Sequence, residues 1–91
     1  MKTIWKARIK KHAKFDVMWE INIPAPLGSR AISVGIQDDE PTVWFEVDTD
    51  KPEGRLRLYA VGTGRSVFPN NARFVGTFIQ NENVFHIYAE N

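Results

Sequence analysis

The chain has 91 residues, of which 43% are hydrophobic and 12% aromatic, and it contains no cysteine. This length predicts a single domain over residues 1–91, and the apolar content predicts a folded chain. The lack of cysteine excludes disulfides, a thiolate nucleophile and a cysteine-ligated zinc. No apolar run is long enough to span a bilayer, and the first residues lack the apolar segment of a signal peptide. We therefore expect a cytoplasmic protein that makes no membrane contact.

A formal net charge of +1 conceals charge that is segregated along the chain. Six lysines and arginines fall within residues 1–14, where no acid occurs. Residues 38–53 carry seven acids and one lysine, and residues 55–73 carry four arginines and no acid. Solvated strand faces with cross-strand pairing account for this pattern, and so does a basic face for an anion beside an acidic loop.

Apolar and polar residues alternate with a period of two through most of the chain, which predicts β-strands. The first strand, residues 3–10, has one charged face and is typical of a sheet edge protected by lysines. A second strand covers residues 15–23, and the prolines within residues 24–29 predict a break after it. Five more strands are expected between turns rich in proline, glycine, asparagine and aspartate, at residues 30–37, 42–48, 55–61, 73–80 and 83–89.

About seven short strands without a helical stretch predict an all-β fold, a small antiparallel sandwich or barrel. In the third strand we expect Ile32, Val34 and Ile36 to point into the core. Large apolar side chains such as Trp44 and Tyr59 also occupy faces that a half-buried strand leaves polar. This excess is hard to bury in 91 residues, so we expect an apolar interface patch and a homo-oligomer, a dimer or higher.

The best candidate binding site is the turn after the 55–61 strand. Glycines there permit positive φ angles, so that backbone N–H groups can converge on an anion. A hydroxyl and a planar guanidinium add groups suited to phosphate or carboxylate. The turn lacks the length and the lysine of a P-loop, and a plain hairpin turn or bulge explains the glycines equally. The candidate ligand-binding residues are Trp44, Arg55, Arg57, Tyr59, Gly62, Thr63, Gly64 and Arg65.

Other residues that often carry chemistry give weaker signals. His86 lies mid-strand and is typical of a structural histidine, and His12 lies in a basic loop. Two distant histidines without cysteine argue against a metal site, and the carboxylates of residues 38–40 diverge on a tight turn. Trp5 and Trp19 lie on apolar faces and are expected in the core, whereas Trp44 is expected at an interface or pocket. We expect no enzyme, no cofactor and no nucleic-acid partner.

Several short segments resemble a family of small phage and bacterial proteins of unknown function. They are Met1–Lys6, Pro41–Trp44, Tyr59–Gly64, Phe74–Phe78 and Val84–His86. The family carries Tyr-Gly-Thr-Gly-His, whereas here Ala60 and Val61 precede the glycines and Arg65 stands at the histidine position, which puts any role of that histidine in doubt. The resemblance implies phage origin. Small phage proteins that are neither enzymes nor virion parts are often inhibitors of host defence, and some sequester nucleotide immune signals as compact oligomers.

These observations favour a non-enzymatic phage binding protein that acts against host defence by sequestering a nucleotide-type immune signal at an oligomer interface. Arg55, Arg57, Arg65 and the Gly62–Gly64 turn would hold phosphates, and Trp44 or Tyr59 would stack on a base. Two alternatives stay open. One is an inhibitor that binds a host defence protein directly, through the acidic 38–53 segment or an exposed aromatic face. The other is an accessory structural phage protein without a ligand.

Overall fold

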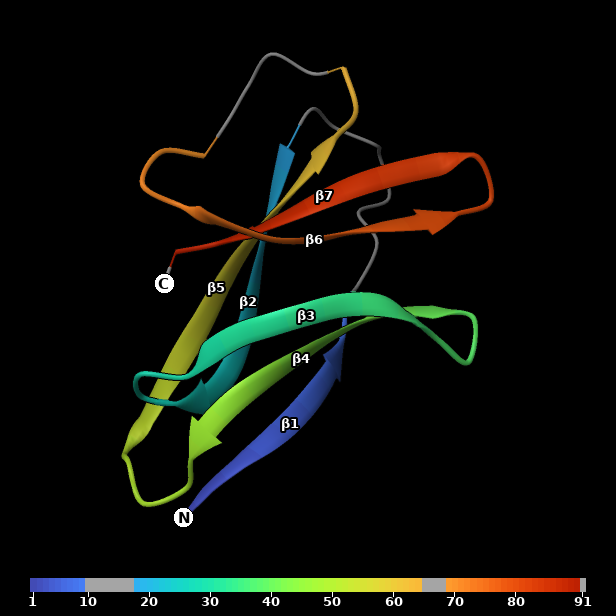
Figure 1. Ribbon diagram of the computed structural model, residues 1–91. Coiled ribbons are helices and arrows are strands. Elements are labelled where there is room, and N and C mark those ends of the chain that lie inside the picture. The colour runs from blue at the N-terminus through green and yellow to red at the C-terminus, as the bar shows by residue number, and fades with distance from the viewer. Residues whose placement is uncertain (10–17, 65–68, 91) are drawn as a thin grey trace.

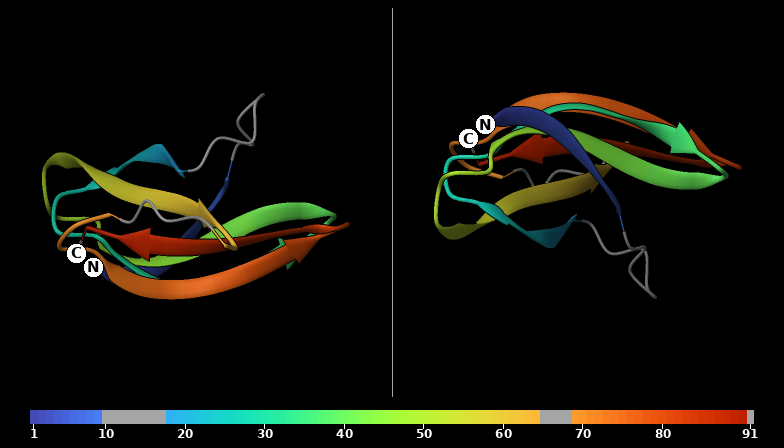
Figure 2. Two further views of the ribbon diagram at one scale, coloured as in Figure 1. Left: turned by 90° about the horizontal axis from the view of Figure 1, so that it is seen from above. Right: turned by 90° about the horizontal axis from the view of Figure 1, so that it is seen from below.

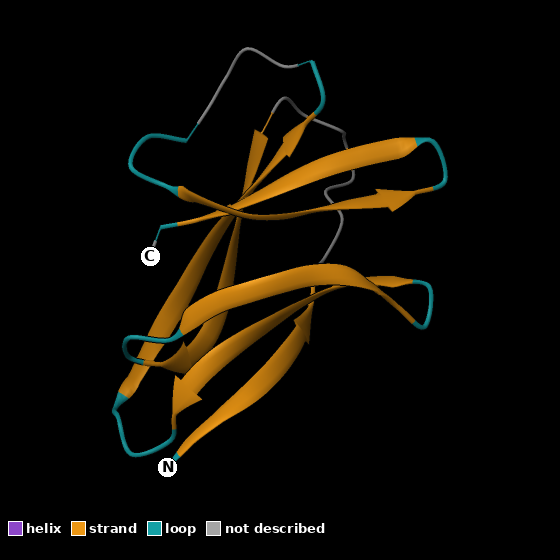
Figure 3. Ribbon diagram, in the orientation of Figure 1, coloured by secondary structure: helices purple, strands orange, loops and turns teal. Residues whose placement is uncertain are grey.

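The computed structural model describes residues 1–9, 18–64 and 69–90. In these ranges every regular element is a β-strand (Figure 3), which confirms the predicted all-β class. The strands are β1 (Lys2–Arg8), β2 (Met18–Pro26), β3 (Arg30–Gln37), β4 (Glu40–Asp48), β5 (Glu53–Gly62), β6 (Arg73–Gln80) and β7 (Asn83–Ala89). Among the residues described, no helix has the length and hydrophobicity needed to cross a membrane.

The strands form two antiparallel sheets, one in the order β1-β4-β3 and the other in the order β2-β5-β7-β6. At one side β6 runs along β3 in the same direction (Figure 1), and we call this contact the β3–β6 seam. At the other side β1 and β2 belong to separate layers, as the views from above and below show (Figure 2). The two sheets therefore do not close into a barrel.

The core lies between the sheets and follows the predicted alternation in the central strands. Val43, Phe45 and Val47 of β4 face Leu56 and Leu58 of β5, and all five are buried. The other buried residues of the core come from β2, β3, β5, β6 and β7 and from Ile9, the residue after β1. Since sheet-forming side chains alternate between faces, this single register buries the apolar half of each central strand.

β2 departs most from its predicted bounds. The predicted residues 15–17 lie outside the described residues, and the strand continues through Pro24 to Pro26, where we predicted a break. Leu27 donates its N–H to the Pro52 carbonyl at 2.8 Å, so the backbone N–H and C=O groups of the odd-numbered residues of β2 point toward β5. The backbone nitrogens of Pro24 and Pro26, which carry no hydrogen, point to the edge of β2 away from β5, so no hydrogen bond to β5 is lost.

The inward face of β3 also differs from the prediction. A register shift between Ala31 and Ser33 inserts Ile32 as an extra residue, so that Ala31 rather than Ile32 reaches the core. Ile32 and Ile36 are 36% and 41% exposed, and Val34 alone of the three predicted residues packs against the core. The prediction for Ile32 was wrong because the alternation does not reveal a bulge. Ile36 has the same parity as Val34 and lies opposite buried Pro41, but it stands next to the end of β3 and is exposed there, so the prediction that it points into the core was also wrong.

Side chains rather than backbone pairs hold the β3–β6 seam together. Arg73 of β6 donates a hydrogen bond to the Ala31 carbonyl, and Gln80 Nε2 donates to the Asp39 carbonyl at 2.6 Å. Burial, with the nearby charge of Arg30, lowers the pKa of Arg73. Both bonds use backbone carbonyls along β3 and in the turn that follows it, so each end of β6 is fixed against this segment.

Between these bonds the backbones approach closely at Gly76, and this contact yields a prediction. A Cβ added at Gly76 would lie 2.7 Å from Cγ2 of Val34, a branched side chain with little rotamer freedom. We expect Gly76→Ala to lower the free energy of unfolding by about 1–3 kcal/mol, as overpacking does. Chemical denaturation of the two proteins measures this difference.

Two further variants control this measurement. Gly35→Ala places its Cβ 3.6 Å from the Trp44 ring, an ordinary contact, and should change stability little. Val34→Ala should recover most of the loss when combined with Gly76→Ala, because it removes the clashing methyl group. Equal effects of Gly76→Ala and Gly35→Ala would contradict the close approach at the seam.

Candidate functional site

Arg57, a predicted phosphate ligand, lies on the outer face of β5 and already has partners. Its Nε is 2.7 Å from Glu20 Oε1, its Nη1 is 3.3 Å from Glu90 Oε2, and Nε also donates to Asn22 Oδ1 at 3.4 Å. Glu20, and then Glu90, raise the pKa of Arg57. Tyr59 donates its hydroxyl to the same Glu90 at 3.5 Å. One cation thus meets two carboxylates, which leaves this cluster poorly suited to hold a phosphate.

Trp44 lies on the outer face of the other sheet, where it is half-buried and packs over Gly35. Its strand neighbours are Lys6 and Ser33. Because Tyr59 and Gly62 belong to β5 in the opposite sheet, one chain does not bring Trp44 to the predicted turn. Only a second copy could place them in one site.

The Gly62–Gly64 turn contacts His86, and in the described residues it does not lie in a cluster of arginines. Gly64 adopts the expected positive φ, 81°, but the Thr63 N–H donates to the Val84 carbonyl at 3.4 Å and is not free for an anion. The Thr63 hydroxyl is 2.8 Å from His86 Nε2, and Thr77 Oγ1 is 2.8 Å from Nδ1. Both ring nitrogens are therefore satisfied, which is the structural role expected for His86. The predicted Arg65 lies outside the described residues.

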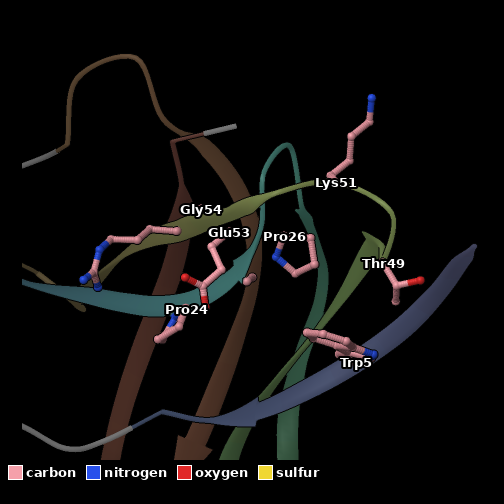
Figure 4. A pocket seen from close by; sticks show the side chains of 9 residues that line it. Trp5, Pro24, Pro26, Thr49, Lys51, Glu53 and Gly54 are labelled. Carbon is pink, nitrogen blue, oxygen red and sulfur yellow. The ribbon is translucent and has the colours of Figure 1, made fainter.

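A groove between β1 and β2, which we call the β1–β2 groove, has the features that the predicted site lacks. It encloses about 620 Å³, within the usual range for small-molecule sites. Trp5 forms one wall and Pro24 and Pro26 the other (Figure 4). Its lining residues are Trp5, Pro24, Ala25, Pro26, Thr49, Lys51, Glu53, Gly54 and Arg55.

The groove combines an accessible aromatic ring with unpaired cations. Trp5 is 42% exposed although its ring contacts Phe45 edge-on, with centroids 6.5 Å apart. In the described part of the chain neither Arg55 nor Lys51 has a carboxylate within ion-pair distance. The Glu53 side chain points toward Pro24, on the proline side of the groove (Figure 4). A flat ring, a carboxylate and two cations can together hold a ligand that has a ring, hydroxyls and an anionic group.

Of the predicted site residues that the structure describes, Arg55 alone lines this groove. Trp5 was expected in the core, and that expectation was wrong, because β1 and β2 do not pair and the interior stays open beside the ring. Pro24 and Pro26 were interpreted as breakers rather than as a wall. The sequence pattern does place Trp5 on the same face as Ala7 and Ile9. The structure shows that only Ile9 of these three is fully buried.

A second groove lies on the outer face of the three-stranded sheet. It encloses about 740 Å³, and three of its lining residues are exposed and apolar, Ile4, Leu27 and Ile32. Lys2, Arg30, Glu46 and Asp48 also line it. We call it the outer groove. An apolar strip among charges of both signs is the composition found in protein interfaces.

The two hydroxyl contacts of His86 predict that this residue fixes the Gly62–Gly64 turn. We expect His86→Ala to speed amide hydrogen exchange of Thr63 by about fivefold or more, since about 1 kcal/mol of hydrogen bonding is lost. Thr77→Val is the matched control, because it removes the contact at Nδ1 and keeps the one between Nε2 and Thr63. Unchanged exchange at Thr63 in His86→Ala would show that the turn is fixed by other contacts.

Comparison with known proteins places this chain in one family. A profile described as a domain of unknown function, DUF7352, matches residues 1–91. The chain therefore belongs to the DUF7352 family. No curated protein matches it, and no solved structure matches it.

Proposed function

We propose that this DUF7352 protein is a non-enzymatic binding protein whose ligand is of the nucleotide class and occupies the β1–β2 groove. The observation that carries the proposal is the exposed Trp5 ring in a groove that Arg55 and Lys51 also line, two cations that have no ion pair in the described residues. The base stacks on Trp5, the phosphates contact Arg55 and Lys51, and Glu53 accepts hydrogen bonds from sugar hydroxyls. Of the arginines predicted to hold phosphates, Arg55, Arg57 and Arg65, this proposal keeps Arg55.

A binding role rather than catalysis is supported by the state of the groups that catalysis needs. His86 has threonine hydroxyls on both ring nitrogens and, among the described residues, no carboxylate partner to orient it as a general base. Among the described residues that line the groove there is no histidine. The one lining hydroxyl, that of Thr49, donates to the Met1 carbonyl at 3.2 Å rather than to a carboxylate.

The biological setting of the proposal comes from the resemblance to small phage proteins. Under it, the protein is phage-encoded, works in the host cytoplasm and sequesters a nucleotide immune signal. Direct inhibition of a host protein is the second candidate, and one observation favours it. Phe74 and Ile79 on the outer face of β6 are 55% and 64% exposed, which suits a protein partner.

The proposal includes a homo-oligomer that forms through the outer groove. Its apolar strip and its mixed charges allow the same surface to face itself across a two-fold axis. We expect Ile32→Asp to convert the oligomer into a monomer in native mass spectrometry, because it places a charge in the strip. Ile79→Asp, a matched change on the other sheet, should leave the oligomer intact. A wild-type monomer would remove this part of the proposal.

The nucleotide site is tested by titration with a panel of cyclic and ADP-ribose-type nucleotides, read by native mass spectrometry and calorimetry. We expect stoichiometric binding that Trp5→Ala weakens by about 5- to 150-fold, the usual range for loss of a stacked base. Arg55→Ala should weaken it by about tenfold or more, since a charged hydrogen bond is lost.

Two variants serve as controls for this titration. Arg57→Ala and Trp44→Phe should leave the affinity unchanged within about twofold, because neither residue lines the groove. A larger loss in Arg57→Ala than in Arg55→Ala would move the site to the outer face of β5. No binding of any nucleotide would favour the protein-inhibitor alternative.

A further inference from the structure

The two sheets have four edge strands, and three of these edges are covered or blocked. β3 and β6 cover each other at the seam, where Arg73 and Gln80 use carbonyls of the β3 side. β2 directs Pro24 and Pro26 outward, and proline offers no N–H to an added strand. The remaining edge is that of β1, which in the described part of the chain pairs with β4 alone.

The backbone groups that β1 presents at its edge follow from its register. Ile9 donates its N–H to the Pro41 carbonyl at 2.8 Å, and Thr49 donates to the Met1 carbonyl at 2.9 Å. The backbone N–H and C=O groups of the odd-numbered residues of β1 therefore point toward β4. The N–H and C=O groups of the even-numbered residues point to the free edge, those of Lys2, Ile4, Lys6 and Arg8.

The side chains of these even-numbered residues make this edge basic. Lys2, Lys6 and Arg8 have no carboxylate within ion-pair distance in the described residues. Lys6 donates to the neutral Gln37 amide at 2.6 Å, which leaves its charge uncompensated. On the other face of β1, Trp5 lies open beside the edge. The edge thus offers positive charge on one face and an apolar ring on the other.

Charge decides which strand fits. A second copy of β1 pairing in antiparallel fashion would set Lys2, Lys6 and Arg8 against the same basic residues, and like charges that face each other destabilise a pair. A strand with acidic side chains would instead pair opposite charges. Its residues opposite the even-numbered positions of β1 would be acidic, and the side chains of its alternate residues would lie on the face of Trp5.

We propose that the β1 edge binds an extended acidic peptide as an added antiparallel strand, with acidic residues against Lys2, Lys6 and Arg8 and apolar residues beside Trp5. This is strand addition to an exposed sheet edge, in which backbone bonds supply affinity and alternate side chains supply specificity. The proposal shares Trp5 with the proposed nucleotide site, but the backbone edge of β1 and the cations Lys2, Lys6 and Arg8 lie outside the β1–β2 groove, so strand addition does not require that a nucleotide binds.

The test uses a blocked heptapeptide that alternates glutamate and valine, with amide hydrogen exchange of the full-length protein as the readout. We expect the peptide to slow exchange at Ile4, Lys6 and Arg8, whose N–H groups face the edge. Exchange at Trp5 and Ala7, which face β4, should change little. Slowing at all of these amides alike, or at none, would overturn the proposal. The proposal would also be overturned if exchange at the even-numbered amides slowed without peptide as the protein concentration rises, because a second copy of the chain would then occupy the edge.

Two N-methylated peptides of identical composition make the test independent of protein variants. Methyl groups on the glutamate amides should weaken binding by about tenfold or more, because these N–H groups face β1. Methyl groups on the valine amides should have little effect. Equal affinities of the two peptides would show that binding is not strand addition. In Lys2→Glu/Arg8→Glu, a peptide that alternates lysine and valine should replace the acidic one, and retained preference for glutamate would contradict the charge assignment.

Discussion

The structure depends on the contact between β3 and β6, because in residues 1–9, 18–64 and 69–90 it is the one place where the two sheets meet edge to edge. Gly76 lets the backbones approach to the point where a single added carbon would clash with Val34. Arg73 and Gln80 complete the contact through backbone carbonyls instead of a strand ladder. With the sheets joined on this side, the seven strands curve around a common core and leave their opposite side, between β1 and β2, open.

The sequence predicted the strands of this fold well, and its failures have physical causes. Alternation placed the inward faces of β4 and β5 correctly, because both strands lie inside their sheets and neither carries a bulge. It failed for Ile32, because a bulge places this residue outside the alternation without leaving a mark in the pattern. It failed for Ile36 for another reason, since this residue keeps the parity of Val34 but lies next to the end of β3, where the side chain stays exposed. It also ended β2 before Pro24, because the cost of a proline depends on whether its side of the strand is paired, and pairing is a property of the whole sheet.

The candidate site was harder to predict, since it depends on neighbours that are distant in sequence. Arg55 and Arg57 are equivalent in the strand pattern, yet Arg57 is paired with Glu20 and Glu90 whereas Arg55 lines the β1–β2 groove. Glu90 lies beyond the last strand, and only the pairing of β5 with β7 brings it to Arg57. In the same way, Trp5 has the pattern of a core residue, and it is exposed because the strand that would cover it is turned away.

The prolines of β2 connect these features. A sheet that curves this far would close if β2 could pair with β1, and closure would bury Trp5 and remove both the groove and the free edge. Pro24 and Pro26 remove two of the donors that such a ladder needs, and they stand where Trp5 faces them across the groove (Figure 4). The prolines that protect β2 from unwanted strands thus also hold the fold open, and the binding surfaces proposed for this protein exist because of that opening.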